Sequence, residues 1–323
     1  MKAIRVHQHG GPDVLAYETV EIGEPGLGEV RVRNRAIGVN FVDVYMRRGS
    51  YPPPQLPFIP GKEGAGEVVA VGPDVEEFKP GDRVAYAEAL GAYAEEHNVP
   101  AHMLVHLPDD IDFETGAGMM LKGLTAQYLL RRTFRVEAGH TILVHAVAGG
   151  VGLILTQWAK NLGATVIGTA GSREKAELAR SAGADHVIDY AKENFAVRVR
   201  EFTGGEGVDV VYDGIGQATF EGSLDSLRPF GHFVSFGAAS GPIAPFDITT
   251  LAMKGALYAT WPLLPTHLAR REDVLAMTKD LFDVVETGAV KIPVHARLPL
   301  ADAAKAHRRL EGRQTTGAMV LLP

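Results

Sequence analysis

The sequence contains no cysteine among its 323 residues. Disulfides, thiolate catalysis and zinc or iron–sulfur sites with cysteine ligands are therefore excluded. An uninterrupted apolar run of the ~20 residues that cross a bilayer is also missing. The first eight residues lack the apolar segment of a secretion signal. We therefore expect a cytoplasmic protein that has no membrane partner.

An excess of positive charge is missing as well, because the formal net charge is −7. That balance gives no general attraction to nucleic acids or anionic lipids, so it counts against both as partners. Hydrophobic residues make up 46% of the chain and charged residues 22%, which is typical of a folded globular protein. At roughly 150 residues per domain, the length predicts about two domains.

The N-terminal part of the chain and the part after residue 141 differ in the spacing of their apolar residues. Over the first ~120 residues, short strands such as 29–36 alternate with Gly and Pro turns, which predicts a β barrel or sandwich. From residue 141 onward, strands alternate with helices. This α/β pattern predicts a doubly wound parallel sheet with right-handed crossovers. The expected strands of that sheet are 141–146, 165–169, 185–188, 208–212 and 231–236.

A glycine-rich turn follows the first strand of the parallel sheet and opens an amphipathic helix. Glycines at this point let the backbone approach a pyrophosphate, and the helix N-terminus offers free amides to the anion. We therefore predict a dinucleotide site here, the alternative being a tight turn without a ligand. The predicted cofactor contacts in this turn are Ala148, Gly149, Gly150, Val151 and Gly152.

The end of the next strand indicates which dinucleotide is bound. An NAD site usually has an acidic residue there to hold the ribose 2′-hydroxyl, but this strand is followed by Gly171, Ser172, Arg173, Glu174 and Lys175. A 2′-phosphate needs hydrogen-bond donors and positive charge, so we predict NADPH, held by Gly171, Ser172 and Lys175. The alternative is that the two cations are solvated residues of a helix, which Glu174 favours.

Several motifs together resemble the zinc-free medium-chain dehydrogenase/reductase superfamily, in particular the NADPH:quinone oxidoreductases related to zeta-crystallin. The resemblance covers the whole chain and rests on residues 36–43, 61–66, 122–125, 146–152, 234–237 and 321–323. It implies a GroES-like substrate domain at 1–124, a Rossmann NADPH-binding domain at 125–260, and a C-terminal segment at 261–323 that returns to the substrate domain. It also implies a homodimer.

The resemblance further implies that no metal takes part. Where zinc members of the superfamily place their ligands, this sequence has Asn40, Lys62 and Leu121, and lysine and leucine cannot build that site. His97, His102 and His106 are interpreted as surface or packing residues. Without a Lewis acid, we expect a quinone as substrate, since a quinone is already electrophilic and needs only hydrogen-bond donors for its developing oxyanion.

Candidate residues for the substrate follow from this chemistry and from the resemblance. Asn40, Tyr45 and Lys122 are the predicted donors, although Asn40 could instead form a turn and Tyr45 could pack in the core. Asp43 is expected to orient a neighbour. Tyr51 and residues 52–54 resemble the segment at the pocket mouth of relatives.

The resemblance implies further cofactor contacts and leaves alternatives open. The implied contacts are Lys122 and Thr125 at the nicotinamide ribose, Tyr190 at the adenosine phosphate, Phe236, Gly237 and Ser240 after the fifth strand, and Arg313. An NADPH-dependent enone or alkenal reductase fits the same residues, and a non-catalytic, crystallin-like protein that binds NADPH or RNA is the alternative from another class. Residues 256–260 could supply the strand that pairs two subunits.

Overall fold

The computed structural model describes residues 1–51 and 55–323, which form two compact units. Unit 1 contains residues 1–124, 267–286 and 292–323. Unit 2 contains residues 125–266 and 287–291. The chain thus leaves unit 1 after Leu124, returns to it at His267, and contributes one further short stretch to unit 2.

Unit 1 is built on a mixed β sheet with a separate two-stranded ribbon, β1 and β2. The sheet order is β14-β15-β3-β4-β5-β7, and β6 also pairs with β3. The strands are β1 (Lys2–Val6), β2 (Leu15–Thr19), β3 (Glu29–Gly38), β4 (Glu63–Val71), β5 (Arg83–Ala87), β6 (Glu96–Pro100), β7 (Leu104–His106), β14 (Val294–Pro299) and β15 (Ala318–Leu322). The last two strands show that the end of the chain completes the sheet begun by its start.

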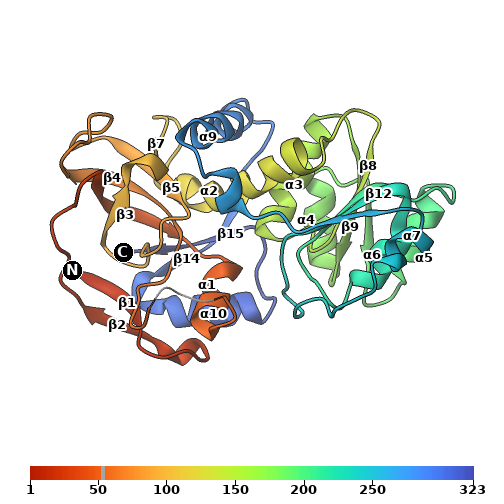
Figure 1. The fold of residues 1–323 in the computed structure, drawn as a ribbon, viewed down its shortest axis with the longest axis horizontal. Coiled ribbons are helices and arrows are strands. Elements are labelled where there is room, and N and C mark those ends of the chain that lie inside the picture. The colour runs from red at the N-terminus through yellow and green to blue at the C-terminus, as the bar shows by residue number, and fades with distance from the viewer. Residues whose placement is uncertain (52–54) are drawn as a thin grey trace. The chain divides into compact units, whose positions relative to one another are not determined.

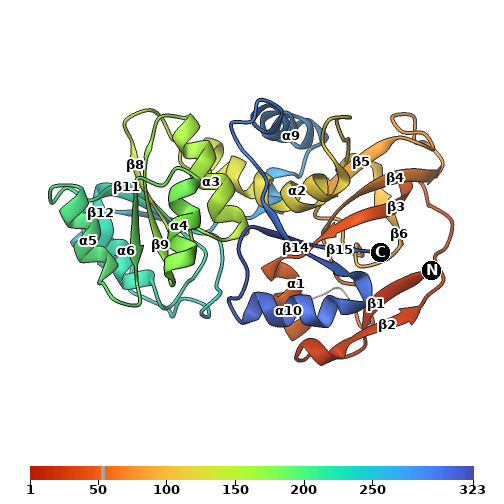
Figure 2. The ribbon, with the colours of Figure 1, turned by 180° about the vertical axis from the view of Figure 1, so that it is seen from behind.

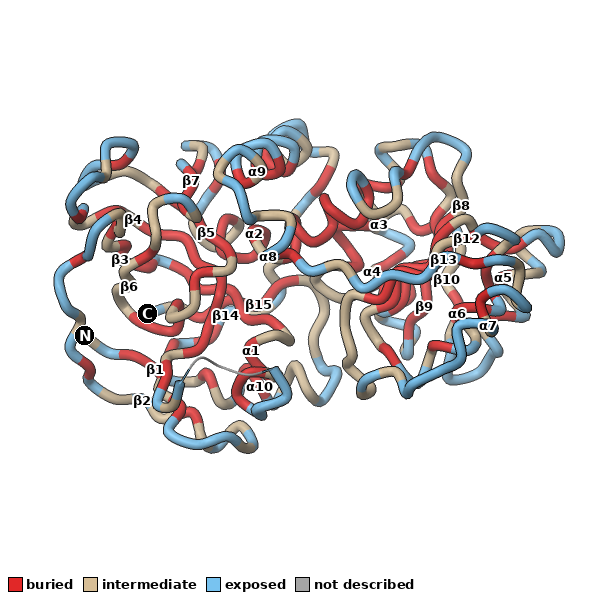
Figure 3. Tube along the Cα trace, viewed as in Figure 1, coloured by how far each residue is buried: buried red, intermediate tan, exposed pale blue. Residues whose placement is uncertain are grey.

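The core of unit 1 follows from the alternation along its strands. In β3, Val30 and Val32 point inward and are fully buried, and they pack with Val68 of β4 and Val84 of β5. Figure 3 shows the burial along these strands. Helices and short 3₁₀ turns cover the sheet: α1 (Phe41–Arg48), α2 (Phe113–Tyr128), α9 (Arg271–Glu286), α10 (Ala303–Glu311), and 3₁₀ turns at Pro12–Val14, Ala101–Met103 and Leu300–Asp302.

Two of these helices correct the prediction that the first ~120 residues form only short strands. Helix α1 begins after Asn40, which is its N-cap residue. Helix α2 contains three glycines, which have low helix propensity. Tertiary packing explains two of them: a Cβ on Gly123 would lie 2.5 Å from the Leu281 side chain, and one on Gly118 would lie 3.1 Å from Ala318.

Unit 2 confirms the predicted doubly wound parallel sheet. Its strand order is β10-β9-β8-β11-β12-β13, the Rossmann order, in which all strands are parallel and the strand order reverses between β8 and β11. The strands are β8 (Thr141–Val144), β9 (Thr165–Ala170), β10 (His186–Asp189), β11 (Val208–Asp213), β12 (Leu227–Ser235) and β13 (Tyr258–Thr260).

Helices lie on both faces of this sheet (Figures 1 and 2). One face is covered by α5 and α6, whose Val199 and Leu224 pack against Leu143, Ile167 and Val211 of the strands. The helices of unit 2 are α3 (Gly150–Asn161), α4 (Arg173–Ser181), α5 (Phe195–Phe202), α6 (Phe220–Ser226) and α7 (Thr249–Met253), with a π-helical turn at Leu129–Thr133. A short helix, α8 (Leu264–His267), lies where the chain returns to unit 1. In the described part of the chain, helices that could span a membrane are absent.

Candidate active site

The centre of the polar cluster in unit 1 is Glu63, the first residue of β4, which is fully buried. Its Oε2 accepts hydrogen bonds from Asn40 Nδ2 and Lys122 Nζ, each at 2.8 Å. Its Oε1 accepts one from the backbone amide of Leu121 at 2.7 Å. A buried carboxylate needs such compensation, and here one cation and two neutral donors provide it. Glu63 therefore fixes Asn40 and Lys122 beside each other.

Asn40 and Asp43 have local roles at the start of α1. Asn40 is the N-cap residue, and its backbone amide donates to Asp43 Oδ2 at 2.8 Å. A carboxylate in the first helical turn also interacts favourably with the helix dipole. Asp43 is fully buried, and desolvation raises its pKa to about 7 despite this hydrogen bond. Asp43 is thus hydrogen-bonded to the backbone of Asn40, and its role toward the substrate stays a prediction.

Lys62 precedes Glu63 in the sequence, and its ammonium forms an ion pair with another carboxylate. It forms a short ion pair with Glu88, and its Nζ lies 5.6 Å from the centre of the Tyr51 ring. An ammonium cannot ligate a metal, the Leu121 side chain has no donor atom, and the Asn40 amide is bound to Glu63. The three positions therefore do not fit a zinc ion. Across residues 1–51 and 55–323, groups of three or more potential metal ligands are also absent.

The two tyrosines predicted at the substrate site lie on or just after α1. Tyr45 is half-buried within the helix, and its ring centre is 6.1 Å from that of Phe41. Tyr51 is 38% exposed, so its ring remains accessible beside Lys62. Residues 52–54, which we predicted at the pocket mouth, lie outside the described residues.

The predicted phosphate-binding turn of unit 2 connects β8 to α3. Gly149 is the N-cap of α3, so no side chain caps its first amides. A Cβ on Gly149 would meet only the Ala146 carbonyl, at 3.1 Å, and would otherwise point into open space. A Cβ on Gly152 would lie 2.5 Å and 2.7 Å from the carbonyls of Ala146 and Val147. Gly152 thus permits close helix packing, while Gly149 leaves room for an anion, and the turn fits a pyrophosphate.

The residues predicted to bind the adenosine end of the cofactor lie at the ends of β9 and β10. Ser172 caps α4, where its Oγ accepts from the Lys175 backbone amide at 3.3 Å. Tyr190 follows β10, and a Cβ on Gly171 would lie 2.4 Å from its hydroxyl. The structure therefore brings Gly171, Ser172, Lys175 and Tyr190 together at the carboxyl ends of β9 and β10.

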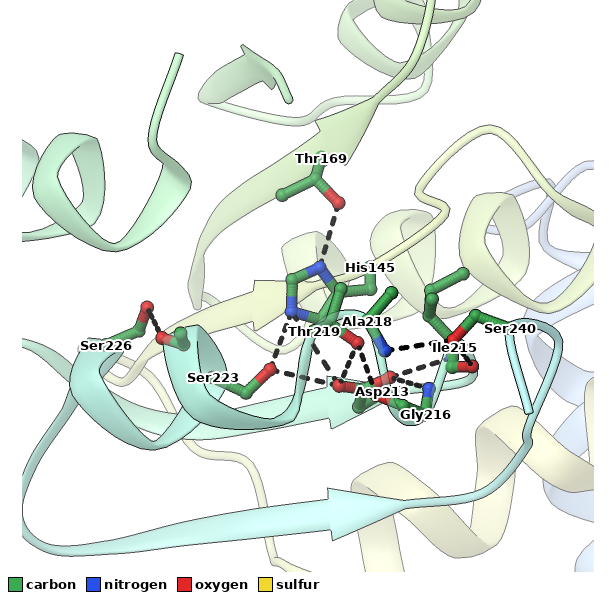
Figure 4. Close-up of polar contacts among 11 residues, drawn as sticks. His145, Thr169, Asp213, Ile215, Gly216, Ala218, Thr219, Ser223, Ser226 and Ser240 are labelled. Atoms are coloured by element: carbon green, nitrogen blue, oxygen red, sulfur yellow. Dashed lines mark hydrogen bonds and ion pairs between the residues drawn. The ribbon is translucent and has the colours of Figure 1, made fainter. Parts of the chain in front are cut away.

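Asp213 organises the loop at the point where the sheet order reverses (Figure 4). Its Oδ1 accepts from the amides of Ile215 and Gly216 at 2.7 and 3.0 Å, and its Oδ2 accepts from the hydroxyls of Thr219 and Ser223 at 2.7 and 3.0 Å. Four hydrogen bonds to one buried carboxylate hold the loop after β11 rigidly, so its backbone is preorganised at the sheet edge where such folds bind ligands.

A buried histidine extends this network toward β8 and β9. His145 Nε2 lies 3.0 Å from Ser223 Oγ, and its Nδ1 lies 2.9 Å from Thr169 Oγ1. Because the Ser223 proton goes to Asp213, Ser223 must accept from Nε2–H, and Nδ1 then accepts from Thr169. Burial lowers the pKa of His145, which agrees with this neutral form.

The predicted contacts after β12 lie against the same loop. The Phe236 amide donates to the Asp213 carbonyl at 2.9 Å, and a Cβ on Gly237 would lie 2.8 Å from the Gly214 carbonyl. Ser240 joins the two loops, since its hydroxyl donates to the Ile215 carbonyl at 2.8 Å. These contacts place all three predicted residues at the reversal point.

The remaining predicted residues belong to different units. Thr125 is buried on α2 at the start of unit 2. Arg313 is exposed and has φ of +55° in unit 1. Their roles toward the cofactor stay predictions. Of the three histidines, His97 packs edge-on against Tyr86, with ring centres 5.6 Å apart, and His106 is exposed.

The predicted site residues do not include Glu63, nor Tyr93 and His307, whose side chains lie 3.1 Å apart while the Tyr93 hydroxyl donates to Asp43. Glu63 had one signal, because a charged residue at the start of a largely apolar strand needs a partner if it is buried. Tyr93 and His307 had none, since a single tyrosine and a single histidine in unrelated segments are ordinary core residues.

Comparisons with known proteins place the chain in a class. Residues 26–109 match the alcohol dehydrogenase GroES-like domain, and residues 150–260 match the zinc-binding dehydrogenase domain. With the geometry above, these matches define an oxidoreductase of the medium-chain dehydrogenase/reductase superfamily.

Relatives that match over nearly the whole chain identify the family within this superfamily. A quinone oxidoreductase of Pseudomonas aeruginosa is 54% identical, over 100% of this chain and 99% of its own. The crystal structure of Escherichia coli quinone oxidoreductase complexed with NADPH has a TM-score of 0.98 at 45% identity, with 100% of both chains covered. A 2-haloacrylate reductase of a Burkholderia species is 47% identical over 98% of each chain. The chain belongs to the quinone oxidoreductase family.

Proposed function

We propose that the protein is an NADPH-dependent, metal-independent quinone reductase. The observation that carries this proposal is that one chain of the quinone oxidoreductase family has both an open phosphate turn and a buried donor cluster at Asn40, Glu63 and Lys122. The E. coli relative, crystallised with NADPH, supports the cofactor. The paired Lys62 and the donor-free Leu121 support independence from zinc.

The residues of unit 1 suit a substrate that gains negative charge. Bound NADPH would supply the hydride. Lys122 carries a positive charge in a buried setting, where it stabilises a developing oxyanion more than it would in water. Asn40 is held in one orientation by Glu63 and Asp43, so it would lose little freedom when it contacts substrate. Tyr51 and Tyr45 would add an aromatic surface for a flat ring.

The decisive assay is oxidation of NADPH by metal-stripped protein with naphthoquinone, benzoquinone, a 2-alkenal, a 2-haloacrylate and an alcohol/aldehyde pair. We expect rapid turnover with the quinones only. Preference for the alkenal or the haloacrylate would favour a conjugated-acid or enone reductase, the alternative supported by the Burkholderia relative. NADPH binding without any turnover would favour the crystallin-like binding protein, and zinc-dependent alcohol oxidation would contradict the proposal.

The preference for NADPH over NADH can be tested at Lys175. We expect Lys175→Ala to raise the Kd of NADPH by roughly tenfold or more, because one cation near the 2′-phosphate contributes about 1.5–3 kcal/mol. The Kd of NADH should change less than about twofold. Ser172→Ala is a less clean test, since it also removes the cap of α4.

Fluorescence titration of both cofactors measures this difference. Lys279→Ala is the matched control, because Lys279 is an exposed lysine on α9 in unit 1 with an i,i+4 partner, Asp283. Equal losses for NADPH and NADH in Lys175→Ala would show that Lys175 does not contact the 2′-phosphate.

We also propose a homodimer formed through the edge of the parallel sheet, and a cytoplasmic location. β13 is the last strand of that sheet, and all three of its residues are exposed. Large exposed apolar side chains occur on and near it: Phe230, Met253, Tyr258, Trp261 and Leu263. An exposed strand with apolar surroundings is a site for pairing with another chain.

A charge on β13 should break such a dimer. We expect Tyr258→Lys to convert a dimeric mass to a monomeric one at micromolar concentration, because a buried lysine at an interface costs several kcal/mol. Light scattering coupled to gel filtration gives the mass. Leu275→Lys, which changes an exposed apolar residue of α9, should leave it unchanged. A monomeric mass for the unaltered protein would contradict the dimer.

A further inference from the structure

A continuous series of buried hydrogen bonds leads from α10 toward the Asn40–Glu63–Lys122 cluster. At the α10 end, this series includes Arg47, a fully buried residue of α1 that is bonded to two residues of α10. Its guanidinium donates to both carboxylate oxygens of Glu311, at 2.7 and 3.1 Å, and to His307 Nδ1 at 3.1 Å. Helices α1 and α10 lie beside each other in both ribbon views (Figures 1 and 2).

The chemistry of arginine fixes the direction of the next bonds. A guanidinium has no acceptor, so His307 Nδ1 must accept and cannot carry a proton. Neutral His307 therefore has its proton on Nε2, which lies 3.1 Å from the Tyr93 hydroxyl oxygen. Burial, followed by the neighbouring charge of Arg47, lowers the pKa of His307 to about 3 and keeps the ring neutral.

Tyr93 in turn holds Asp43. Because its oxygen accepts from His307, its own proton is available for Asp43 Oδ2, at 3.1 Å. Asp43 Oδ2 has one further donor, the Asn40 amide. Asp43 Oδ1 is buried and has no hydrogen-bond partner among the described residues. The orientation of this carboxyl group therefore depends on two donors to a single oxygen.

We propose that Tyr93 and His307 are positioning residues for quinone reduction, because they orient Asp43 and thereby fix Asn40 beside Lys122. This inference rests on the proposed function. Neither residue is proposed to contact substrate. The effect reaches the substrate through Asn40, whose amide proton is bound by Asp43 and whose side chain is bound by Glu63.

The test is the steady-state kinetics of Tyr93→Phe, His307→Leu and His307→Gln. We expect the first two to lower kcat/KM for naphthoquinone roughly tenfold. The KM for NADPH should stay within about twofold, because the predicted phosphate and adenosine contacts belong to unit 2. His307→Gln should retain most of the activity, since its amide can accept from Arg47 and donate to Tyr93. It also keeps the test informative if His307→Leu does not fold.

The pH profile separates positioning from loss of stability. The groups that face Asp43 are Tyr93, Lys122, Glu63 and, through Tyr93, His307 with Arg47. The Tyr93 hydrogen bond lowers the pKa of Asp43. Tyr93→Phe should therefore move the acidic limb of kcat/KM, expected near pH 7, to higher pH, whereas His307→Gln should move it little.

Tyr86→Phe is the matched control. Tyr86 is also fully buried in unit 1, but its hydroxyl donates to Asn34, outside this series. We expect it to lose stability with little change in kcat/KM or in the pH profile. Unaltered kinetics in Tyr93→Phe, or an equal loss in Tyr86→Phe, would overturn the positioning role. Absence of quinone turnover in the unaltered protein would instead contradict the proposed function.

Discussion

Replacing Asp43 or His307 should make the stability of the protein depend on pH in opposite directions. The pKa of Asp43 rises from 3.8 to about 7 on folding, and that of His307 falls from 6.5 to about 3. Between pH 4 and 6.5, the unfolded chain therefore carries a protonated His307 and an ionised Asp43, and the folded protein carries both groups neutral. Folding moves a proton from one residue to the other without changing the number bound.

The two contributions to the free energy of unfolding therefore cancel in the unaltered protein. The Asp43 contribution is present at low pH and is lost as the pH rises toward 7. The His307 contribution is present above pH 6.5 and is lost as the pH falls toward 3. Between pH 4 and 6.5, these two residues leave stability nearly independent of pH.

When one residue is replaced, the pH dependence that the other residue gives to the free energy of unfolding is no longer cancelled. Asp43→Asn should lose stability on acidification from pH 6.5 to 4, and His307→Gln should lose stability as the pH rises from 4 to 6.5. Each change is on the order of 3 kcal/mol, from 1.36 kcal/mol per unit over this range. Each replacement can keep the hydrogen bonds of the original side chain.

Urea denaturation at several pH values between 4 and 6.5 measures these slopes. The double variant Asp43→Asn/His307→Gln is the control and should again show a flat profile, because it lacks both groups. Parallel profiles for the two single variants would show that the buried pair does not exchange a proton on folding.

Gly152→Ala should abolish NADPH binding and destabilise unit 2, whereas Gly149→Ala should weaken binding alone. A Cβ at residue 152 would collide with two backbone carbonyls that cannot rotate away, so α3 must move from the turn. Overpacking of this kind costs about 1–3 kcal/mol or more. At residue 149 the φ of −76° is accessible to alanine, and apart from one contact with the Ala146 carbonyl at 3.1 Å the Cβ would occupy the space that we assign to a phosphate.

Calorimetric titration with NADPH and urea denaturation distinguish these two effects. We expect Gly149→Ala to keep its free energy of unfolding within about 0.5 kcal/mol and to lose at least tenfold in affinity. Gly139→Ala is unsuitable as a control because its φ is +89°. Gly11→Ala is suitable, since Gly11 lies in unit 1, has a φ of −70°, and an added Cβ would meet nothing. Unchanged affinity in Gly149→Ala would contradict the phosphate site.

The local and periodic features of this protein follow from its amino-acid sequence alone. The alternation of strands and helices after residue 141 specified a parallel sheet, because parallel strands need crossovers and buried strands need apolar runs. The turn at 146–152 specified where a dinucleotide would bind, since only glycines allow that backbone to pack closely. The predicted activity, in contrast, rested mainly on motifs shared with a known family.

The organisation of the proposed substrate site, in contrast, follows from tertiary packing. Asn40 caps α1, Glu63 begins β4 and Lys122 lies on α2, yet their side chains meet. Asp43 is held by Tyr93, and Tyr93 by His307, which is 214 residues further along the chain. A buried carboxylate is stable only with donors around it, and the donors come from whichever segments the packing brings near. Such pairs leave no periodic pattern in the sequence. Each residue fits the pattern of its own helix or strand, and its partner depends on how these elements pack.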